Sequence, residues 1–186
     1  MNRLRLFPQA VIVIGIAFAI GGLVAAGAGF YIHSFVVQQL ADQNITTPSD
    51  ASIPNAPVND IPTALSMADI IEHHAAGIGG GLTYAEMGRF AVPSGDPAGT
   101  SNAEEALLDE AGNPVPNSSR ETLLTAAGLV TSLSLSAMAI GVSYGAVALG
   151  IGFIVLGLVI AGLGYALLGL ITPEVAERFG LRPVSG

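Results

Sequence analysis

Apolar residues lie in two blocks of the chain that contain no charged side chain. The first block covers residues 10 to about 37, and the second covers residues 122 to 172. A helix of about 20 apolar residues crosses the hydrocarbon core of a bilayer, so the first block is long enough for one membrane span. The second block is long enough for one long helix or for two spans. This pattern predicts a helical membrane protein.

Charged residues are distributed unevenly around the two blocks. Arg3 and Arg5 precede the first block, and Arg178 and Arg182 follow the second. Segment 38–121 contains twelve acidic and two basic side chains, a net charge of −10. Because arginines near span ends mark the cytoplasmic side, we expect both termini in the cytoplasm and the acidic segment outside it. This orientation requires an even number of spans and favours two, while a three-span arrangement with an outer C-terminus stays open.

Serine and threonine divide the second block into two parts. They recur between residues 122 and 143 and are absent from 146–171. We therefore predict a transmembrane helix at 146–171 and an outer or interfacial helix at 122–145. The sequence leaves open whether these parts form one continuous helix or break near Gly141–Gly145.

The expected fold is an all-α membrane protein in which two transmembrane helices form a hairpin. A largely irregular extracytoplasmic segment with one or two short helices joins them. The first transmembrane helix is predicted at 10–37, between a cytoplasmic N-terminus at 1–9 and the outer segment at 38–121, and a cytoplasmic C-terminus is predicted at 172–186. The N-terminus also has features of a signal peptide, but its apolar run is longer than usual and favours an uncleaved anchor.

Each predicted span carries a stripe of small residues. The stripe of the first span is Gly15, Ala19, Gly22, Ala26 and Gly29, and that of the second is Gly150, Gly157, Ala161 and Gly164. Steps of three, four or seven residues keep the members of a stripe on one helix face. Small residues allow another helix to approach closely, which drives association in lipid. The stripes therefore predict packing, either between the two spans or against the helices of a partner.

Proline, glycine and acidic residues dominate the outer segment. The stretch Asn44–Pro62 is expected to be an extended arm that stays mobile unless it lies on a partner. Ser66 is the expected N-cap of a short helix, and residues 90–117 are expected to form a surface loop. Ser118 and Glu121 have the spacing of a capping box that opens the second apolar block.

The sequence offers few groups for chemistry. It contains no cysteine, which excludes disulfides and thiolate metal sites, and its pI near 4.5 argues against nucleic-acid binding. Adjacent His73 and His74 point about 100° apart on a helix and do not make a chelating pair. His33 has no second histidine in the other span for haem ligation, so we expect a packed or interface histidine. The spans lack the charges of an ion or proton path, and we predict no catalytic, cofactor-binding or metal site.

Three stretches of the outer segment resemble a group of small actinobacterial two-span membrane proteins. They are Gln43–Thr46, Ala68–Ile71 with His74-Ala75, and Gly80–Glu86, which are similar to ENIT, ADIIN-HA and GGKTYAEL in that group. Members often carry a label as aromatic ring-opening dioxygenases, and some resemble accessory subunits or association factors of the respiratory cytochrome bc–aa3 supercomplex. The resemblance covers most of residues 11–170, but the loop from Gly88 to Asn117 is longer here than in the group.

The resemblance implies a non-catalytic accessory subunit of the plasma membrane that supports the assembly or stability of the respiratory supercomplex. Its expected partners are the subunits of that complex, including respiratory cytochromes, and the lipid bilayer. The alternative is a free-standing, self-associating membrane protein of the cell envelope, and a third hypothesis, an enzyme, lacks a visible metal-binding set. The candidate partner contacts are Ile70, Ile71, His74 and Tyr84.

Overall fold

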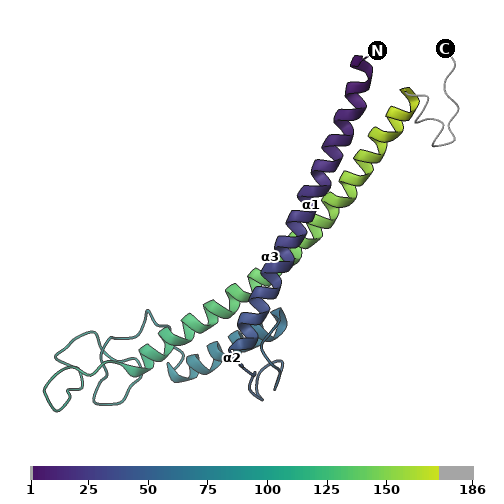
Figure 1. The fold of residues 1–186 in the computed structure, drawn as a ribbon. Helices are drawn as coiled ribbons and strands as arrows, with labels where there is room; N and C mark the ends of the chain where they lie inside the picture. The colour runs from purple at the N-terminus through teal and green to yellow at the C-terminus, as the bar shows by residue number, and fades with distance from the viewer. Residues whose placement is uncertain (1, 172–186) are drawn as a thin grey trace. The chain divides into compact units, whose positions relative to one another are not determined.

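A computed structural model describes residues 2–171 of the chain, and the predicted segment 172–186 lies outside this range. The described residues form three α-helices and no strand, which confirms the all-α class. The helices are α1 (Asn2–Asp42), α2 (Ile61–Ile78) and α3 (Ser118–Ile171) (Figure 1). Helices α1 and α3 are both long and apolar enough to cross a membrane, which suggests a membrane location.

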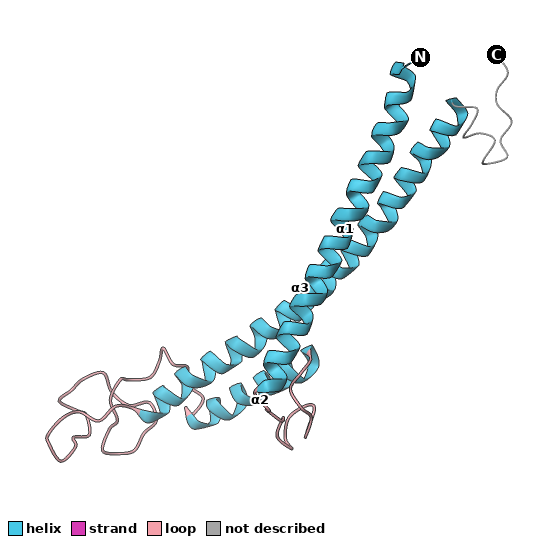
Figure 2. Ribbon diagram, viewed as in Figure 1, coloured by secondary structure: helices cyan, strands magenta, loops and turns pink. Residues whose placement is uncertain are grey.

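Helix α3 is continuous, which answers the question that the sequence left open. It runs without a break through Gly141 and Gly145 and has 54 residues. Helix α1 has 41 residues and extends beyond the predicted span at both ends (Figure 2). Both helices are longer than the predicted spans, so a residue that belongs to α1 or α3 does not have to lie within the bilayer.

The chain divides into two compact units, which are described separately. The two-helix unit comprises the described parts of 1–34 and 141–186, and the central unit comprises 35–140. In the two-helix unit, α1 packs directly on α3 along the small-residue stripes. The rings of Phe18 and Phe153 also meet edge to face, with centroids 5.8 Å apart.

The core of the central unit lies where α2 meets the neighbouring parts of α1 and α3. Val58, Ala64 and Ile140 are almost completely buried there. Alanine is frequent in this core, so the helix backbones can approach closely without large gaps. The complete set of buried core residues is Leu40, Val58, Ala64, Ala68, Leu133, Ala137 and Ile140.

Helix α2 begins earlier than predicted, and Ser66 is not its N-cap. Asp60 is the N-cap: its carboxylate accepts a hydrogen bond from the backbone N–H of Thr63, and the Thr63 hydroxyl oxygen accepts one from the backbone N–H of Asp60. Ser66 lies buried inside the helix, where its hydroxyl oxygen accepts a hydrogen bond from the backbone N–H of Ile53. Pro62, which the sequence pattern assigns to the arm, instead lies in the first helical turn, where its missing N–H costs nothing.

The prediction of a mobile arm is also wrong, because contacts within the chain hold this stretch in place. Thr47 is buried, and its hydroxyl accepts a hydrogen bond from the backbone N–H of Ala56 at 3.0 Å. Backbone hydrogen bonds also join Thr47 to Asn55 and Val58 to Ile45. The arm buries Val58 in the core, so its order requires no partner.

Residues 88–117 form an irregular loop, as expected, but side chains and isolated β-bridges give it a defined structure. Phe90 forms bridges with both Thr100 and Pro116. The loop ends at Asn117, whose side-chain oxygen accepts hydrogen bonds from the backbone N–H groups of Ser119 and Arg120 at 3.1 and 3.4 Å. Asn117 therefore caps α3, in place of the capping box predicted at Ser118.

Candidate functional site

The small residues of α1 and α3 lie against each other in the two-helix unit. A Cβ atom added to Gly22 would lie 2.5 Å from the carbonyl oxygen of Gly150 and 2.7 Å from the backbone nitrogen of Ile154. Contacts this short exclude any side chain at position 22 unless the helices move apart. Similar close contacts with the opposite backbone involve Gly15, Ala19, Ala26, Gly29, Gly150, Gly157, Ala161 and Gly164.

Burial in this interface recurs every seven residues. Buried positions with this spacing are Pro8, Gly15, Gly22 and Gly29 in α1, and Ser143, Gly150, Gly157 and Gly164 in α3; Gly169 near the end of α3 is also buried. A seven-residue period keeps one face of each helix in contact with the other when the helices wind around each other with a left-handed twist. The interface therefore extends beyond the predicted stripes, to Pro8 in α1 and Ser143 in α3.

Other glycines of the two helices take no part in this contact. A Cβ atom added to Gly21 or Gly27 in α1, or to Gly152 or Gly162 in α3, would meet no atom within 4 Å. Composition alone does not separate these open glycines from the packed ones, but their positions relative to the seven-residue period do.

His33 continues the packed face of α1 by one further turn. Its imidazole ring lies 5.0 Å from the Tyr144 ring, measured between centroids. Its Nδ1 atom is buried and forms no hydrogen bond with a described residue. The side chain thus packs against an aromatic ring, and no second histidine from α3 faces it among the described residues.

The adjacent histidines of α2 do not assemble a metal site with their neighbours. Within residues 2–171, no group of three or more histidine or acidic side chains could hold a metal ion. His74 instead pairs with Asp50 of the arm, with 2.7 Å between Nε2 and Oδ2. This hydrogen bond, assisted by one from the backbone of Asp50 itself, holds the pKa of the Asp50 carboxyl below its usual range.

The four candidate partner contacts differ in the surface that they expose. Ile70 is buried and Ile71 is partly covered against the core, so both offer little surface to a partner. His74 is exposed but is paired with Asp50. Tyr84 is about one-third exposed, and the Arg120 guanidinium lies over its ring at 3.9 Å from the centroid.

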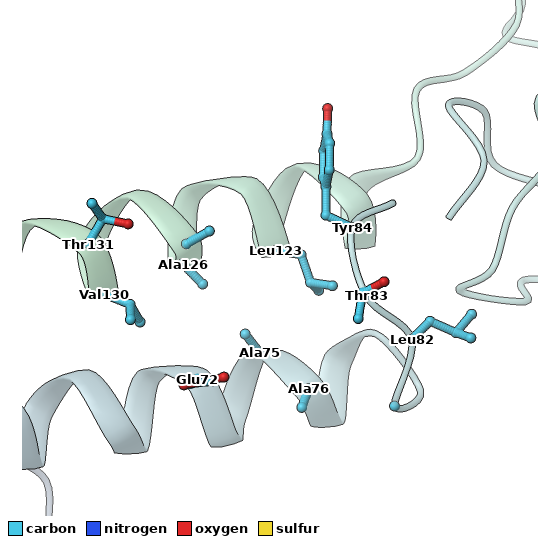
Figure 3. Close-up of a pocket in the computed structure, with 12 residues that line it drawn as sticks. Glu72, Ala75, Ala76, Leu82, Thr83, Tyr84, Leu123, Ala126, Val130 and Thr131 are labelled. Atoms are coloured by element: carbon cyan, nitrogen blue, oxygen red, sulfur yellow. The ribbon is translucent and has the colours of Figure 1, made fainter. Parts of the chain in front are cut away.

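A groove of about 360 Å³ lies between α2 and the N-terminal part of α3, within the central unit (Figure 3). Ala75 of α2 points toward Leu123 and Val130 of α3 across its base. Thr83 and Tyr84 close one end, where the hydroxyl and backbone N–H of Thr83 donate hydrogen bonds to Glu86. These bonds hold the pKa of the Glu86 carboxyl below its usual range. The lining is largely apolar and small.

The N-terminal part of α3 exposes apolar side chains on the faces that α2 does not cover. Leu124, Leu135 and Met138 are each more than half exposed. Several of its hydroxyls turn back into the helix: Ser132 donates to the carbonyl oxygen of Gly128, and Ser136 donates to that of Ser132, both at 2.9 Å. Hydroxyls satisfied in this way do not require water, so an apolar cover is compatible with this helix surface.

Sequence reasoning missed the buried polar residues that organise the central unit. Asn117 donates from its side-chain nitrogen to the carbonyl oxygens of Gly88 and Pro97, at 3.1 and 2.9 Å. Thr47 organises the arm in a comparable way. No local pattern marks these residues, because their partners lie far away in the chain or are backbone atoms.

No family model, curated protein or solved structure matches the chain. Two features of the structure bear on the function. One is the helix pair packed on glycine backbones, and the other is the exposed apolar surface of the central unit.

Proposed function

We propose that this chain is a non-catalytic accessory subunit of a larger membrane protein complex. The observation that carries the proposal is the length of α3 together with its lack of charge. At about 1.5 Å per residue, a helix of 54 residues is about 80 Å long, whereas the hydrocarbon core of a bilayer is about 30 Å thick. A large part of α3 therefore extends beyond the hydrocarbon, yet the helix has no charged residue after Glu121.

The part beyond the bilayer, on this proposal, is the N-terminal part of α3. It exposes Leu124, Leu135 and Met138, and α2 covers only one of its sides. Exposed apolar surface of this kind marks sites of association with a protein or a membrane. The net charge of −10 on segment 38–121 disfavours contact with anionic lipid headgroups. We therefore infer that a protein surface covers the exposed apolar side chains of α3.

The proposed topology follows the arginines at the two ends of the chain. Residues 1–9 and 172–186 lie in the cytoplasm, and the spans are at 10–37 and 146–171. The central segment 38–121 then lies outside the cytoplasm, followed by the outer part of α3 at 122–145. The glycine-packed interface makes the two spans a single hairpin, which anchors the central unit at the membrane.

The resemblance to small actinobacterial two-span proteins supports the respiratory cytochrome bc–aa3 supercomplex as the host. In that role the chain supports assembly or stability and leaves electron transfer to its neighbours. The predicted spans contain no acidic residue, lysine or arginine, and this agrees with a packing role.

Co-purification tests the host directly. The full-length chain, tagged at one terminus, is extracted in mild detergent, and a reduced-minus-oxidised spectrum is recorded on the purified material. We expect haem absorbance to co-purify in fixed proportion to the chain. Cross-linked material that contains only copies of this chain would contradict the proposal and favour the self-associating envelope protein, for which the open glycines Gly21 and Gly152 offer further packing surface.

Single cysteines report the topology without background, because the chain has no natural cysteine. Ala111→Cys places the thiol in an exposed loop of the central unit, and Ser185→Cys places it near the C-terminus. A membrane-impermeant maleimide added to intact cells should label the first variant and reach the second only after permeabilisation. Labelling of both in intact cells would instead support three spans, and the reverse pattern would invert the topology.

A further inference from the structure

The residues at the base of the groove in Figure 3 are buried. Ala75 of α2 and Leu123 and Ala126 of α3 are each at most 9% exposed. They belong to two helices that pack on a common core within the same unit. The groove is thus already shaped before any partner arrives, which lowers the entropic cost of binding.

Small side chains form the edges of the groove. Ala76 on α2 and Ala127 and Thr131 on α3 line it, and none of these side chains is large enough to fill it. Low edges and an apolar base fit a convex, rod-shaped apolar surface, and an α-helix laid between two helices has that shape. Small residues on the receiving helices allow the third backbone to come close.

One carboxylate lines the groove and has no cationic partner in the described part of the chain. Glu72 of α2 is exposed, and the described ion pairing involves only Asp50 and His74. A cation at this place would have to come from the occupant. The charge of the groove thus predicts a lysine or arginine on the docking helix opposite Glu72.

The charge of the surrounding segment decides between the possible occupants. A second copy of this chain would bring another segment with a net charge of −10 against the first, which is repulsive. Anionic lipid headgroups are repelled in the same way. A different protein with basic residues beside an apolar helix face would be attracted by the negative charge and would also bury apolar surface against the groove lining.

We propose that the groove between α2 and α3 binds an α-helix of a second protein, with an apolar face on Ala75 and Ala126 and a lysine or arginine beside Glu72. This inference rests on the proposed role as an accessory subunit and names the site and chemistry of its contact.

Site-specific photocross-linking in cells tests the location. The probe is p-benzoylphenylalanine, placed at Ala76 or Thr131 in the groove. Gly77 and Gly128 are the matched controls: Gly77 follows Ala76, Gly128 lies three residues before Thr131, and both lie outside the groove lining with open space around them. We expect adducts from the groove positions only, and mass spectrometry of the adduct should identify a helical peptide with a lysine or arginine from another protein.

Charge reversal tests the chemistry. Glu72→Lys should lower the adduct yield at Thr131 about tenfold, whereas Asp69→Lys, the same change one turn earlier on α2 and outside the groove, should lower it less than about twofold. Raising the ionic strength should weaken the wild-type adduct and leave little further effect on Glu72→Lys. Far-UV circular dichroism of the purified variants checks that both remain folded.

The outcomes separate this inference from the function on which it rests. If cytochromes co-purify but adducts arise only at Gly77 or Gly128, or at no position, the groove is not the contact and the accessory role stands. Adducts to a second copy of this chain or to lipid overturn the proposed occupant. Adducts to another protein without co-purified haem support the groove and reject the respiratory host.

Discussion

Replacing Gly22 by isoleucine is expected to push α1 and α3 apart and to destabilise the two-helix unit by about 3 kcal/mol. The expected clash is with backbone atoms, since a Cβ atom at position 22 would lie 2.5 Å from the carbonyl oxygen of Gly150 and 2.7 Å from the nitrogen of Ile154. Backbone atoms of a helix cannot turn away as a flexible side chain can. Thermal unfolding of the full-length protein in detergent, followed by circular dichroism, measures the loss.

Gly21→Ile is the matched control, because the substitution is the same and a Cβ atom at position 21 meets nothing within 4 Å. Isoleucine also has a higher helix propensity than glycine, so this variant should be as stable as the wild type or slightly more stable. A second measurement isolates the interface: with Phe18→Cys and Phe153→Cys together, a short thiol-specific cross-linker should join α1 to α3, and Gly22→Ile should suppress this cross-link while Gly21→Ile permits it. Equal behaviour of the two glycine variants would show that α1 and α3 do not pack through this face.

The two long helices can be predicted from local sequence patterns. Two charge-free apolar blocks predict α1 and α3, and steps of three and four residues place Gly15, Gly22 and Gly29 on one helix face. The partner of that face cannot be read from a single helix, however. Two stripes of small residues can pack on each other or on other proteins, and only the backbone contacts between Gly22 and Gly150 distinguish these arrangements.

The start of α2 shows why a local signal can mislead. Ser66 and Asp69 have the spacing of a capping box, but so do Asp60 and Thr63. The choice depends on what else each hydroxyl can bind. Ser66 receives hydrogen bonds from the arm, at the backbone of Ile53 and the hydroxyl of Ser52, and these contacts are invisible until the arm is folded back.

The composition of the arm predicts a mobile segment, because proline and polar residues are typical of disorder. Its prolines and polar residues bury little surface on average, yet Val58 enters the core and the hydroxyl of Thr47 satisfies buried backbone groups. A few buried side chains therefore outweigh the average composition of the stretch. The candidate groove could not be predicted either, because Ala75 and Ala126 are 51 positions apart and ordinary in any helix.

Replacing Asn117 by alanine is expected to have the largest effect in the central unit. Its side-chain nitrogen donates to the carbonyl oxygens of Gly88 and Pro97, and its oxygen caps the first turn of α3. Alanine leaves both carbonyls and the helix N–H groups without these partners, at a combined local cost of about 3 kcal/mol. Amides of loop 88–117, such as that of Phe90, should lose protection from hydrogen exchange while the core amides of α2 retain theirs.

Two further variants separate the roles of Asn117 and control for the substitution. Asn117→Asp keeps the oxygen that caps α3 but cannot donate to Gly88 and Pro97, so the loop amides should exchange faster while the first turn of α3 stays protected. Asn113→Ala removes an exposed asparagine of the same loop, whose side chain hydrogen-bonds to the nearby Asp109, and should change exchange much less. If Asn117→Ala leaves the exchange of Phe90 unchanged, the loop is held by its backbone bridges, and the buried asparagine is not its organising contact.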